Sequence, residues 1–287
     1  MENMKLSYFT QDESFPFYIN YGTHTENMFL HGHEDFFELV IILDGKADHI
    51  VGEERFEVKK GDVFAVGNDI CHGYENPENL KICNIMFRPE ALISADHDLK
   101  QLPGFHALFL IEPSFTSSKN FKSRLKISTD LFTEIKQIIG GAIREYASGS
   151  KGRKTMLTSY FLRLAVILSR AYEEAEPMKE IAGIAEAAAY MESNYNEDIS
   201  IERLVDISHY SQRHFIRLFS DAYHVSPQKY LTSIRLRHAC TILKDTDLSV
   251  TETAMYCGFG DPNYFSRIFK KYSGMTPLQY RKEAGLM

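Results

Sequence analysis

The sequence lacks the features of a secreted, disulfide-bonded or membrane-spanning protein. Its four cysteines are far apart and form no CxxC pair, which is typical of reduced thiols in a cytoplasmic protein. The longest apolar runs, at residues 39–43 and 164–168, are far shorter than the ~20 residues of a membrane helix. No basic and then apolar segment follows Met1, so no signal peptide is expected. These absences predict a cytoplasmic protein with no membrane partner.

The sequence also lacks the strong positive charge that would by itself indicate nucleic-acid binding. Its net charge is −7. Residues 181–287 contain 12 basic and 12 acidic side chains, so the whole acidic excess lies in residues 1–180. With 44% hydrophobic residues, each part can bury a core. The distribution fits an acidic sensor joined to a neutral second domain, but charge alone decides little.

Short runs of β-branched and aromatic residues dominate residues 28–90. Turn-forming residues separate them at Asp44-Gly45, Gly52-Glu53-Glu54 and Lys60-Gly61-Asp62. Closely spaced short strands of this kind predict an antiparallel sandwich or barrel, with a first domain at residues 1–127. The expected strands are residues 40–43, 47–51, 55–58, 63–66 and 82–87.

From Ser128 the apolar residues recur at helical spacing. A first helix is expected to end in the Gly/Ser/Lys-rich break at residues 148–152, and a second helix follows it. Their apolar stripes are expected to pack on the barrel, and the segment 128–176 could also share in the interface of a homodimer. A linker is predicted at residues 172–179, which include Pro177. The third domain, residues 177–287, should be entirely α-helical.

The C-terminal third contains an internal repeat with a period of about 50 residues. Phe215 and Phe219 recur as Phe265 and Phe269. Each unit reads as a short helix, a turn, a second helix and a helix that begins at proline, so the segment predicts two helix-turn-helix motifs. The expected N-caps are Ser226, Ser249, Asp261 and Thr276, and the turn residue Gly258 is expected to have a positive φ angle.

The second helix of each motif, residues 211–222 and 262–272, would enter the major groove of DNA. Arginine can donate two hydrogen bonds to guanine, and Asn or Gln can bond adenine. Two arginines on a helix surface are usually only solvated, but Arg217 recurs as Arg267 on the same face of both repeats. The predicted DNA-binding residues are Gln212, Arg213, Ile216 and Arg217 in the first motif, and Asn263, Ser266, Arg267, Lys270 and Lys271 in the second.

Residues 190–283 closely resemble the DNA-binding domain of AraC-family regulators. The residues that carry the resemblance are Pro227, Tyr230, Arg235, Ala239, Leu243, Ala254, Gly258-Phe259, Tyr264-Phe265, Phe269-Lys270-Lys271, Gly274, Pro277 and Tyr280-Arg281. The first motif departs from the pattern with Ser208-His209 in its turn, where the second has Gly258-Phe259. The resemblance implies two contacts with one face of double-stranded DNA and activation of nearby promoters, with RNA polymerase as a partner.

A histidine-rich constellation lies in the predicted barrel. His31 and His33 share one face of a strand because side chains alternate with a period of two, and a barrel would bring Glu38 and His72 toward them. Imidazoles and a carboxylate suit a divalent transition metal. The spacing resembles the two cupin motifs, which implies that His31, His33, Glu38 and His72 are the four ligands. The second motif departs, with Gly67 and Asp69 where cupins usually have Pro and Gly.

Sensor domains of AraC-family regulators often use a cupin-like barrel as an effector pocket without metal or catalysis. We therefore expect these four residues to bind a small polar effector, with no required cofactor, and a metal site is the alternative. The resemblance extends to sugar-responsive, rhamnose-type regulators, which implies a carbohydrate effector. The neighbours Phe36, Phe37, Phe64 and Tyr74 could stack on a sugar ring, although such residues are more often core.

Two hypotheses follow for the whole chain. The first is an effector-gated transcription regulator that is not an enzyme. The second is a metal-dependent cupin enzyme, such as an isomerase or dioxygenase, with a DNA-binding appendage. An enzyme would need an open coordination position and a nearby acid or base, and no second carboxylate lies close to the four residues in sequence. The complete AraC-like domain therefore favours the regulator.

Overall fold

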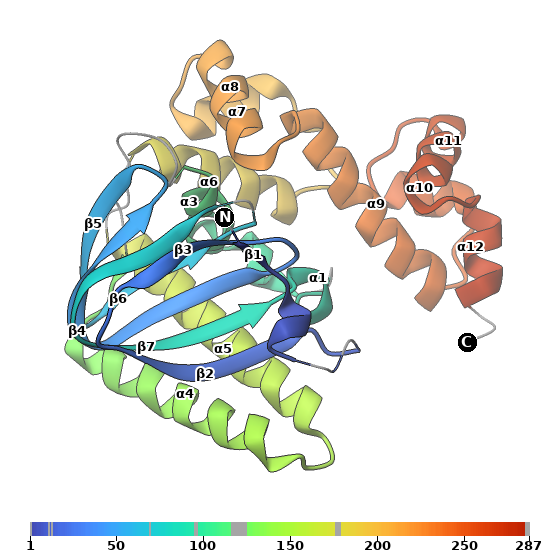
Figure 1. Cartoon of the computed structure of the whole chain (residues 1–287). Coiled ribbons are helices and arrows are strands. Elements are labelled where there is room, and N and C mark those ends of the chain that lie inside the picture. Colours follow the sequence, from blue (N-terminus) through green and yellow to red (C-terminus); the bar gives the residue numbers. More distant parts are fainter. Residues whose placement is uncertain are drawn as a thin grey trace. The chain divides into compact units, whose positions relative to one another are not determined.

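The computed structural model describes residues 2–10, 12, 14–68, 70–94, 97–115, 125–175 and 179–284. The chain divides into two compact units, which are described separately. Unit 1 contains residues 1–94 and 102–185, and unit 2 contains residues 95–101 and 186–287. Along the chain, the β-strands come first and the short helices of unit 2 come last (Figure 1). Asp69 and Pro177 lie outside the described residues, and the expected domain boundaries at 127 and 177 stay predictions.

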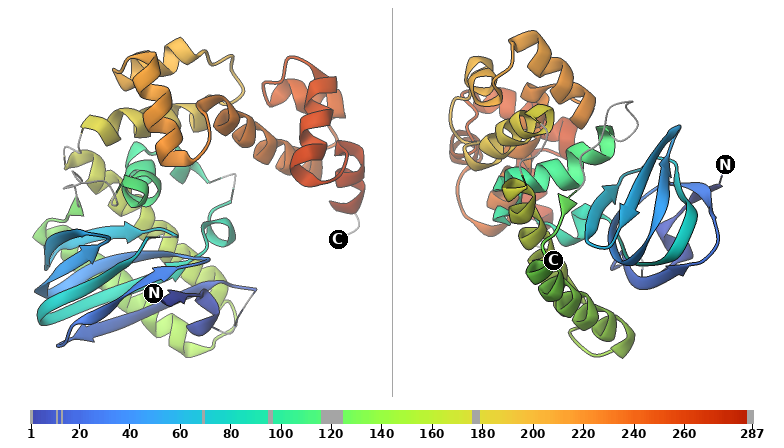
Figure 2. Two further views of the ribbon diagram at one scale, coloured as in Figure 1. Left: turned by 45° about the horizontal axis from the view of Figure 1, so that its top comes forward. Right: turned by 90° about the vertical axis from the view of Figure 1, so that its left-hand side faces the viewer.

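The strands of unit 1 form one cupin-like sheet that curves but does not close (Figure 2). Its path is β1-β3-β7-β4-β6-β8, with β2 paired to β7 and β5 paired to β4. All pairs are antiparallel except β1–β3, which is parallel, so the sheet is mixed rather than purely antiparallel. The strands are β1 (Glu2–Met4), β2 (Phe17–His24), β3 (Met28–His33), β4 (Phe37–Val51), β5 (Glu54–Lys59), β6 (Asp62–Val66), β7 (His72–Phe87) and β8 (Leu125–Lys126).

The expected turn at Asp44-Gly45 is wrong, because β4 runs through it without a break. The pairing of β4 with β7 shifts register at Ile42, Asp44 and Lys46, so this stretch is an irregular, bulged part of the strand. Gly45 has φ +72°, and a Cβ there would lie 2.3 Å from the carbonyl oxygen of Asn79. Turn-type residues therefore mark a bend of a long strand here, not its end.

Alternate side chains of the strands fill the interior of the sheet. The apolar core includes Val40, Ile42, Ala47, Val58, Phe64, Val66, Tyr74, Leu80 and Ile82, all at most 4% exposed. A second, smaller cluster joins Leu6, Phe36 and Met86. The curved sheet therefore encloses a packed interior, and polar groups inside it need partners of their own.

Two long helices cover part of the sheet in unit 1, α4 (Thr129–Ser148) and α5 (Arg153–Glu174) (Figure 1). Ser128 caps α4 by accepting a hydrogen bond from the Leu131 amide, and Gly149 ends the helix with φ +64°. On α5, the Phe161 ring lies 4.5 Å from the Phe87 ring, centroid to centroid. The predicted apolar stripes thus pack within unit 1, as expected.

The short elements of the N-terminal half are helical turns. They are η1 (Leu6–Tyr8), α1 (Pro89–Leu92), η2 (Asp98–Gln101), α2 (Pro103–Phe105), the π-helical η3 (His106–Ile111) and α3 (Glu112–Phe115). The helices that follow α5 are α6 (Lys179–Ser193), α7 (Ile201–Ser208), α8 (Gln212–Tyr223), α9 (Pro227–Asp245), α10 (Val250–Tyr256), α11 (Pro262–Ser273) and α12 (Pro277–Ala284). Within the described parts of the chain, no helix is long and apolar enough to cross a membrane.

The predicted helix caps are confirmed. Ser249 and Glu252 form a capping box, and Ser226 accepts a hydrogen bond from the Lys229 amide. Asp261 accepts from the Asn263 amide, as an N-cap before proline should. With these boundaries, α7 and α8 form one helix-turn-helix motif and α10 and α11 form the other, and the long helix α9 joins them.

Candidate effector site and DNA-binding face

Four polar side chains from three strands meet inside the sheet of unit 1. His31 and His33 come from β3, Glu38 from the start of β4 and His72 from the start of β7. Their ligand atoms all lie within 4.8 Å of one another, and each residue is at most 3% exposed. The four residues therefore meet, as the alternation of side chains on a strand and the motif spacing predicted.

The atoms of this cluster, called the histidine cluster below, are closely spaced. His33 Nε2 lies 3.1 Å from His72 Nε2, and Glu38 Oε2 lies 3.4 Å and 3.2 Å from these two nitrogens. Four metal–ligand bonds of ~2.05 Å in tetrahedral geometry place ligand atoms about 3.3 Å apart. The three atoms therefore already have the separation of ligands around one cation.

Further contacts orient two of the imidazoles. His31 Nδ1 lies 3.2 Å from the carbonyl oxygen of Phe29, to which it donates in the tautomer that carries its proton on Nδ1. His72 Nδ1 lies 3.1 Å from Nε2 of His49, a buried residue of β4. Metal-binding histidines usually make such a contact with their second nitrogen. His49 was not among the predicted site residues, since only the sheet pairing places it beside His72.

Burial favours the neutral form of two imidazoles of the cluster. Loss of hydration lowers the pKa of His33 to about 3, although Glu38 opposes the shift, and burial lowers the pKa of His72 to about 3. Burial likewise raises the pKa of Glu38, against the effect of the nearby histidines. Neutral imidazoles are the form that binds metal.

The donor set fits a divalent transition metal. Glu38 Oε2 and His33 Nδ1 are buried and make no hydrogen bond with any described residue. Glu38 Oε2 lies against His33 Nε2 and His72 Nε2, and one cation between these three atoms would bind all of them. His33 Nδ1, the other nitrogen of the ring, would not be a ligand of that cation. His31, His33, Glu38 and His72 are the residues that would hold it.

The aromatic residues predicted as sugar-stacking candidates are mostly core. Phe36, Phe64 and Tyr74 are at most 4% exposed. Phe36 stacks on His33 with centroids 4.4 Å apart, and Phe64 and Tyr74 stack on His49 at 4.6 and 5.1 Å. Phe37, the fourth candidate, is half-buried.

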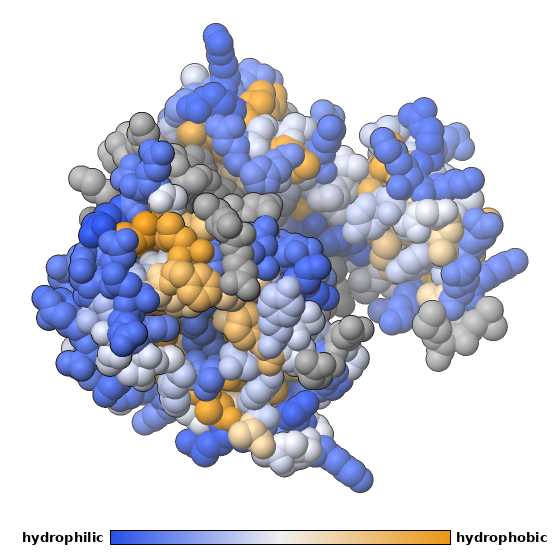
Figure 3. All heavy atoms as spheres, in the orientation of Figure 1, coloured by the Kyte–Doolittle hydropathy of each residue, from blue (hydrophilic) through white to orange (hydrophobic). Residues whose placement is uncertain are grey.

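The exposed aromatic residue nearest to the histidine cluster along β3 is Phe29. Its side chain is 56% exposed, and its neighbour Leu30 is 40% exposed. The Phe29 ring lies 5.7 Å from the His31 ring, centroid to centroid. Apolar side chains also gather over β3 on the face shown in Figure 3. No sequence pattern pointed to Phe29, because alternation on a strand does not reveal which end of the strand is uncovered.

In the second motif, α11 presents a continuous polar face. Phe265 and Phe269 are fully buried, whereas Asn263, Arg267, Lys270 and Lys271 are exposed and Ser266 is half-buried. The Arg267 guanidinium lies over the ring of Tyr264, 5.5 Å from its centroid. All five predicted residues of this helix thus lie on its outward side.

In the first motif, α8 presents a different face. Gln212, Arg213 and Arg217 are exposed. Arg217 forms an ion pair of 3.3 Å with Asp221, one turn further along the helix. Ile216 is half-buried and, with Gln212, lines a groove of about 510 Å³ formed with α7 and the start of α9. The two remain proposed DNA-binding residues, but their surroundings differ from those of the two arginines.

The two helix-turn-helix motifs can be aligned by the residue in each turn whose backbone has the left-handed conformation. His209 has φ +57° and Gly258 has φ +80°, and each follows the first helix of its motif. The turn of the second motif then has one residue more before its N-cap. His209 therefore corresponds to Gly258, rather than to Phe259 as the aligned dipeptides of the sequence suggested.

The two units define a ligand-binding, cupin-like domain followed by a double helix-turn-helix domain. Residues 16–151 match the AraC-like ligand binding domain, and residues 204–283 match a helix-turn-helix domain. The chain therefore combines an AraC-like ligand-binding domain with an AraC-type helix-turn-helix domain.

Several known proteins are similar to this chain. It is 27% identical over 281 residues to the HTH-type transcriptional activator RhaR of Mannheimia succiniciproducens, covering 96% of this chain and 94% of the relative. It is 26% identical over 251 residues to the HTH-type transcriptional activator RhaS of Enterobacter sp. strain 638, covering 87% and 86%. The crystal structure of the DNA-binding domain of AdpA in complex with a target DNA is 30% identical, covers 35% of this chain and 91% of that chain, and has a TM-score of 0.34.

Proposed function

We propose that this protein is a sequence-specific DNA-binding transcription activator, gated by a small polar effector that binds in the cupin-like domain. The observation that carries the proposal is the repeated helix-turn-helix motif with arginine at the same exposed position, Arg217 and Arg267. The relatives RhaR and RhaS are named as activators, which supports the same sign of regulation. The function requires double-stranded DNA and RNA polymerase as partners and places the protein in the cytoplasm.

The DNA is bound by α8 and α11, with their exposed faces in two successive major grooves. Arg213, Arg217 and Arg267 supply bidentate donors to guanine, and Asn263 can bond adenine. Lys270 and Lys271, at the end of α11, contact phosphates, which fix the position of the helix without selecting sequence. A homodimer that uses part of residues 128–176 would place two such domains on one operator and raise the affinity through effective concentration.

The effector is a carbohydrate in this proposal, as in the rhamnose-type regulators that the sequence resembles. The histidine cluster offers polar atoms, and Phe29 offers an exposed ring beside it. Sugars typically combine these two contacts, hydroxyl groups with polar side chains and the C–H face with an aromatic ring. The four cluster residues pack on one another, so a sugar would lie beside them rather than between them.

A divalent cation in the histidine cluster is the second component of the proposal. It would supply a Lewis-acidic anchor for hydroxyl oxygens of the effector. The chain's own residues orient and shield this position: Phe29 and His49 hold the rings of His31 and His72, and burial lowers the pKa of His33 and of His72. The spacing of His33, Glu38 and His72 is the observation that favours a cation over a site made of hydrogen bonds alone. An enzyme is not favoured.

The DNA-binding part of the proposal is tested with operators selected from random duplexes by the full-length protein. Fluorescence anisotropy with a selected duplex is then measured across a panel of neutral sugars that includes L-rhamnose. We expect one sugar to change the affinity for the selected duplex and not for an unrelated duplex. Failure to enrich any sequence would contradict the DNA-binding function, whereas enrichment without any sugar response would contradict the carbohydrate effector.

The metal is tested by elemental analysis of the purified protein and by the sugar response before and after chelation. Glu38→Gln keeps the size of the side chain but removes its charge, and we expect it to lower the bound metal. His49→Phe keeps the stacking on Phe64 and Tyr74 and should weaken metal binding about 10- to 100-fold. His224→Ala, at the exposed residue directly after α8, is the matched histidine control. A metal-free protein that keeps its full response after chelation would show that the cluster is a polar pocket alone.

A further inference from the structure

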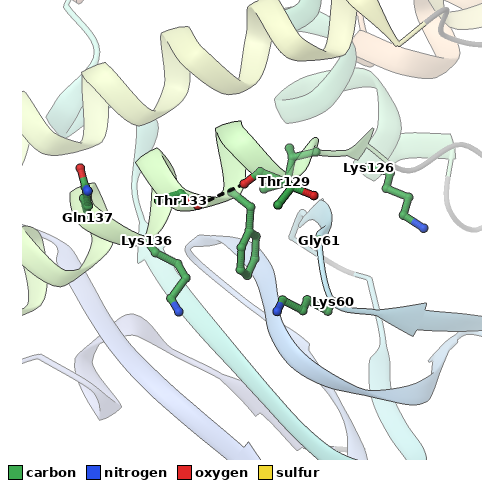
Figure 4. Close-up of a pocket in the computed structure, with 9 residues that line it drawn as sticks. Lys60, Gly61, Lys126, Thr129, Thr133, Lys136 and Gln137 are labelled. Carbon is green, nitrogen blue, oxygen red and sulfur yellow. Dashed lines mark hydrogen bonds between the residues drawn. The ribbon is translucent and has the colours of Figure 1, made fainter.

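A second pocket in unit 1 lies apart from the histidine cluster, where the turn between β5 and β6 meets β8 and the start of α4 (Figure 4). Its volume is about 730 Å³, and none of the four cluster residues lines it. Lys60 comes from the turn, Lys126 from β8, and Lys136 from the second turn of α4. Pockets of this size hold small molecules.

The backbone around this lysine pocket is fixed by regular hydrogen bonds. The Gly61 amide donates to the Ile42 carbonyl oxygen, and the Ile127 amide donates to the Gly61 carbonyl oxygen, both at 3.0 Å. In the β6–β8 ladder, Lys126 is the register partner of Asp62. Three elements distant in sequence therefore hold the lysines in a defined arrangement.

Two of the ammonium groups share one aromatic ring. Lys60 Nζ lies 5.3 Å and Lys136 Nζ 5.8 Å from the centroid of Phe132, which is 8% exposed. The two groups point toward the same space, whereas Lys126 extends away from it (Figure 4). The ring gives each cation a weak attraction but no negative charge to balance the pair.

No carboxylate of the described residues forms an ion pair with any of the three lysines. Two neighbouring acidic side chains have other partners: Glu134 pairs with Arg163 at 2.8 Å, and Asp62 accepts a hydrogen bond from the Lys59 amide at 2.8 Å. A third, Asp130, is an exposed residue of the first turn of α4 and does not line the pocket. The chain between Glu112 and Asp130 contains no acidic residue. Like charges that lie together without counterions repel each other. The two lysines do so although residues 1–180 carry the whole negative net charge of the chain.

We propose that the lysine pocket binds the dianionic phosphate group of a small phosphate ester. Two facing ammonium groups match its two negative charges, and lysine serves as a point charge for phosphate. Thr129 lines the pocket at the positive end of a 20-residue helix, and its hydroxyl adds a donor. Ile127 and Phe132 supply the apolar wall for the rest of the molecule.

The test is isothermal titration calorimetry of the full chain at low salt with glucose 6-phosphate, inorganic phosphate, acetate and glucose. We expect glucose 6-phosphate and inorganic phosphate to bind and glucose to give no heat. Binding of the ester alone would assign the pocket to organic phosphates, and stronger binding of acetate than phosphate would overturn the proposal. Because the pocket is open to solvent, added salt should weaken the binding.

Variants then locate the binding. Lys60→Gln and Lys136→Gln should each weaken phosphate binding about tenfold, since each removes one of two charges. Lys59→Gln is the matched control, because this neighbouring exposed lysine pairs with Glu57 at 3.2 Å. Glu38→Gln should leave phosphate binding unchanged, which separates this pocket from the histidine cluster. Equal loss in Lys59→Gln, or unchanged affinity in the Lys60→Gln/Lys136→Gln double variant with a native circular dichroism spectrum, would disprove the proposal.

Discussion

The two helix-turn-helix motifs of unit 2 have nearly the same core but different surfaces. In the first motif the Phe215 and Phe219 rings lie 5.6 Å apart with an interplanar angle of 54°, and in the second the Phe265 and Phe269 rings lie 5.5 Å apart at 55°. All four rings are fully buried. The repeat therefore preserves the packing of each motif to within a tenth of an ångström in this ring pair.

The outward faces differ most at the ends of the recognition helices. Asp221 of α8 stands where α11 has Lys271, and Ser220 stands where α11 has Lys270. Arg217 is held by Asp221, whereas the equivalent Arg267 lies over a tyrosine ring. Packing therefore constrains the core of a duplicated motif, while its surface can diverge in charge. Because the second motif has two lysines where the first has Ser220 and Asp221, we expect the second to contribute more of the DNA affinity.

The largest difference between the two motifs should appear when the left-handed residue of each turn is replaced and the stability of the protein is measured. Gly258 has φ +80°, and a Cβ there would lie 2.9 Å from the backbone oxygen of Asn196. We expect Gly258→Ala to lower the free energy of unfolding by about 3 kcal/mol, through the left-handed conformation and the steric clash together. His209 is exposed and already bears a Cβ at φ +57°, so His209→Gly should change stability by at most about 1 kcal/mol, in the stabilising direction.

Urea denaturation followed by far-ultraviolet circular dichroism measures both changes. His209→Ala is the matched control for Gly258→Ala, because it introduces the same residue in the equivalent turn of the other motif. Similar losses for the two alanine variants would show that the turns are constrained alike and that the clash with Asn196 is relieved by a small movement.

The sequence predicted the double helix-turn-helix domain well because its signals are local. N-caps before proline, phenylalanine pairs one turn apart and a glycine at a turn each fix a short segment without reference to the rest of the chain. The histidine cluster was predictable for a related reason, since alternation places His31 and His33 on one face of β3.

Other features depended on sheet pairing that no local pattern reveals. Asp44-Gly45 has the composition of a turn, yet the pairing of β4 with β7 continues beyond it, so only the partner strand shows that it is a bulge. His49 meets His72 because β4 and β7 are in register with His49 opposite Tyr74. The lysine pocket combines residues from a turn, a strand and a helix, and its two facing lysines, Lys60 and Lys136, are 76 positions apart in the chain.

A smaller difference should appear in specific DNA binding. We expect Arg267→Ala and Arg217→Ala each to weaken binding to a selected operator by about 1–3 kcal/mol and to relax the preference at one base pair. Arg267→Ala should lie at the upper end of this range and Arg217→Ala at the lower end, because Asp221 competes with DNA for Arg217. Anisotropy with the operator and its single-base variants measures both effects. Arg55→Ala, at an exposed arginine of β5 in unit 1, is the control. An unchanged affinity and sequence preference in both test variants would remove the assigned recognition face.

The smallest effect concerns Asp221 and tests whether the two motifs bind DNA in the same way. If α8 lies in its groove as α11 does, the Asp221 carboxylate occupies the position of a phosphate-binding lysine and repels the backbone. The surface ion pair with Arg217 contributes at most ~1 kcal/mol, and a negative charge near the end of α8 opposes the helix dipole, so Asp221→Asn should leave stability nearly unchanged. We expect this variant to bind both operator and unrelated duplexes about two- to fivefold more tightly, a gain below ~1 kcal/mol that shrinks as salt is added. Weaker binding to the operator alone would instead show that Asp221 positions Arg217 for a base contact, and the first motif would then use its acidic residue as part of the recognition face rather than lack a lysine there.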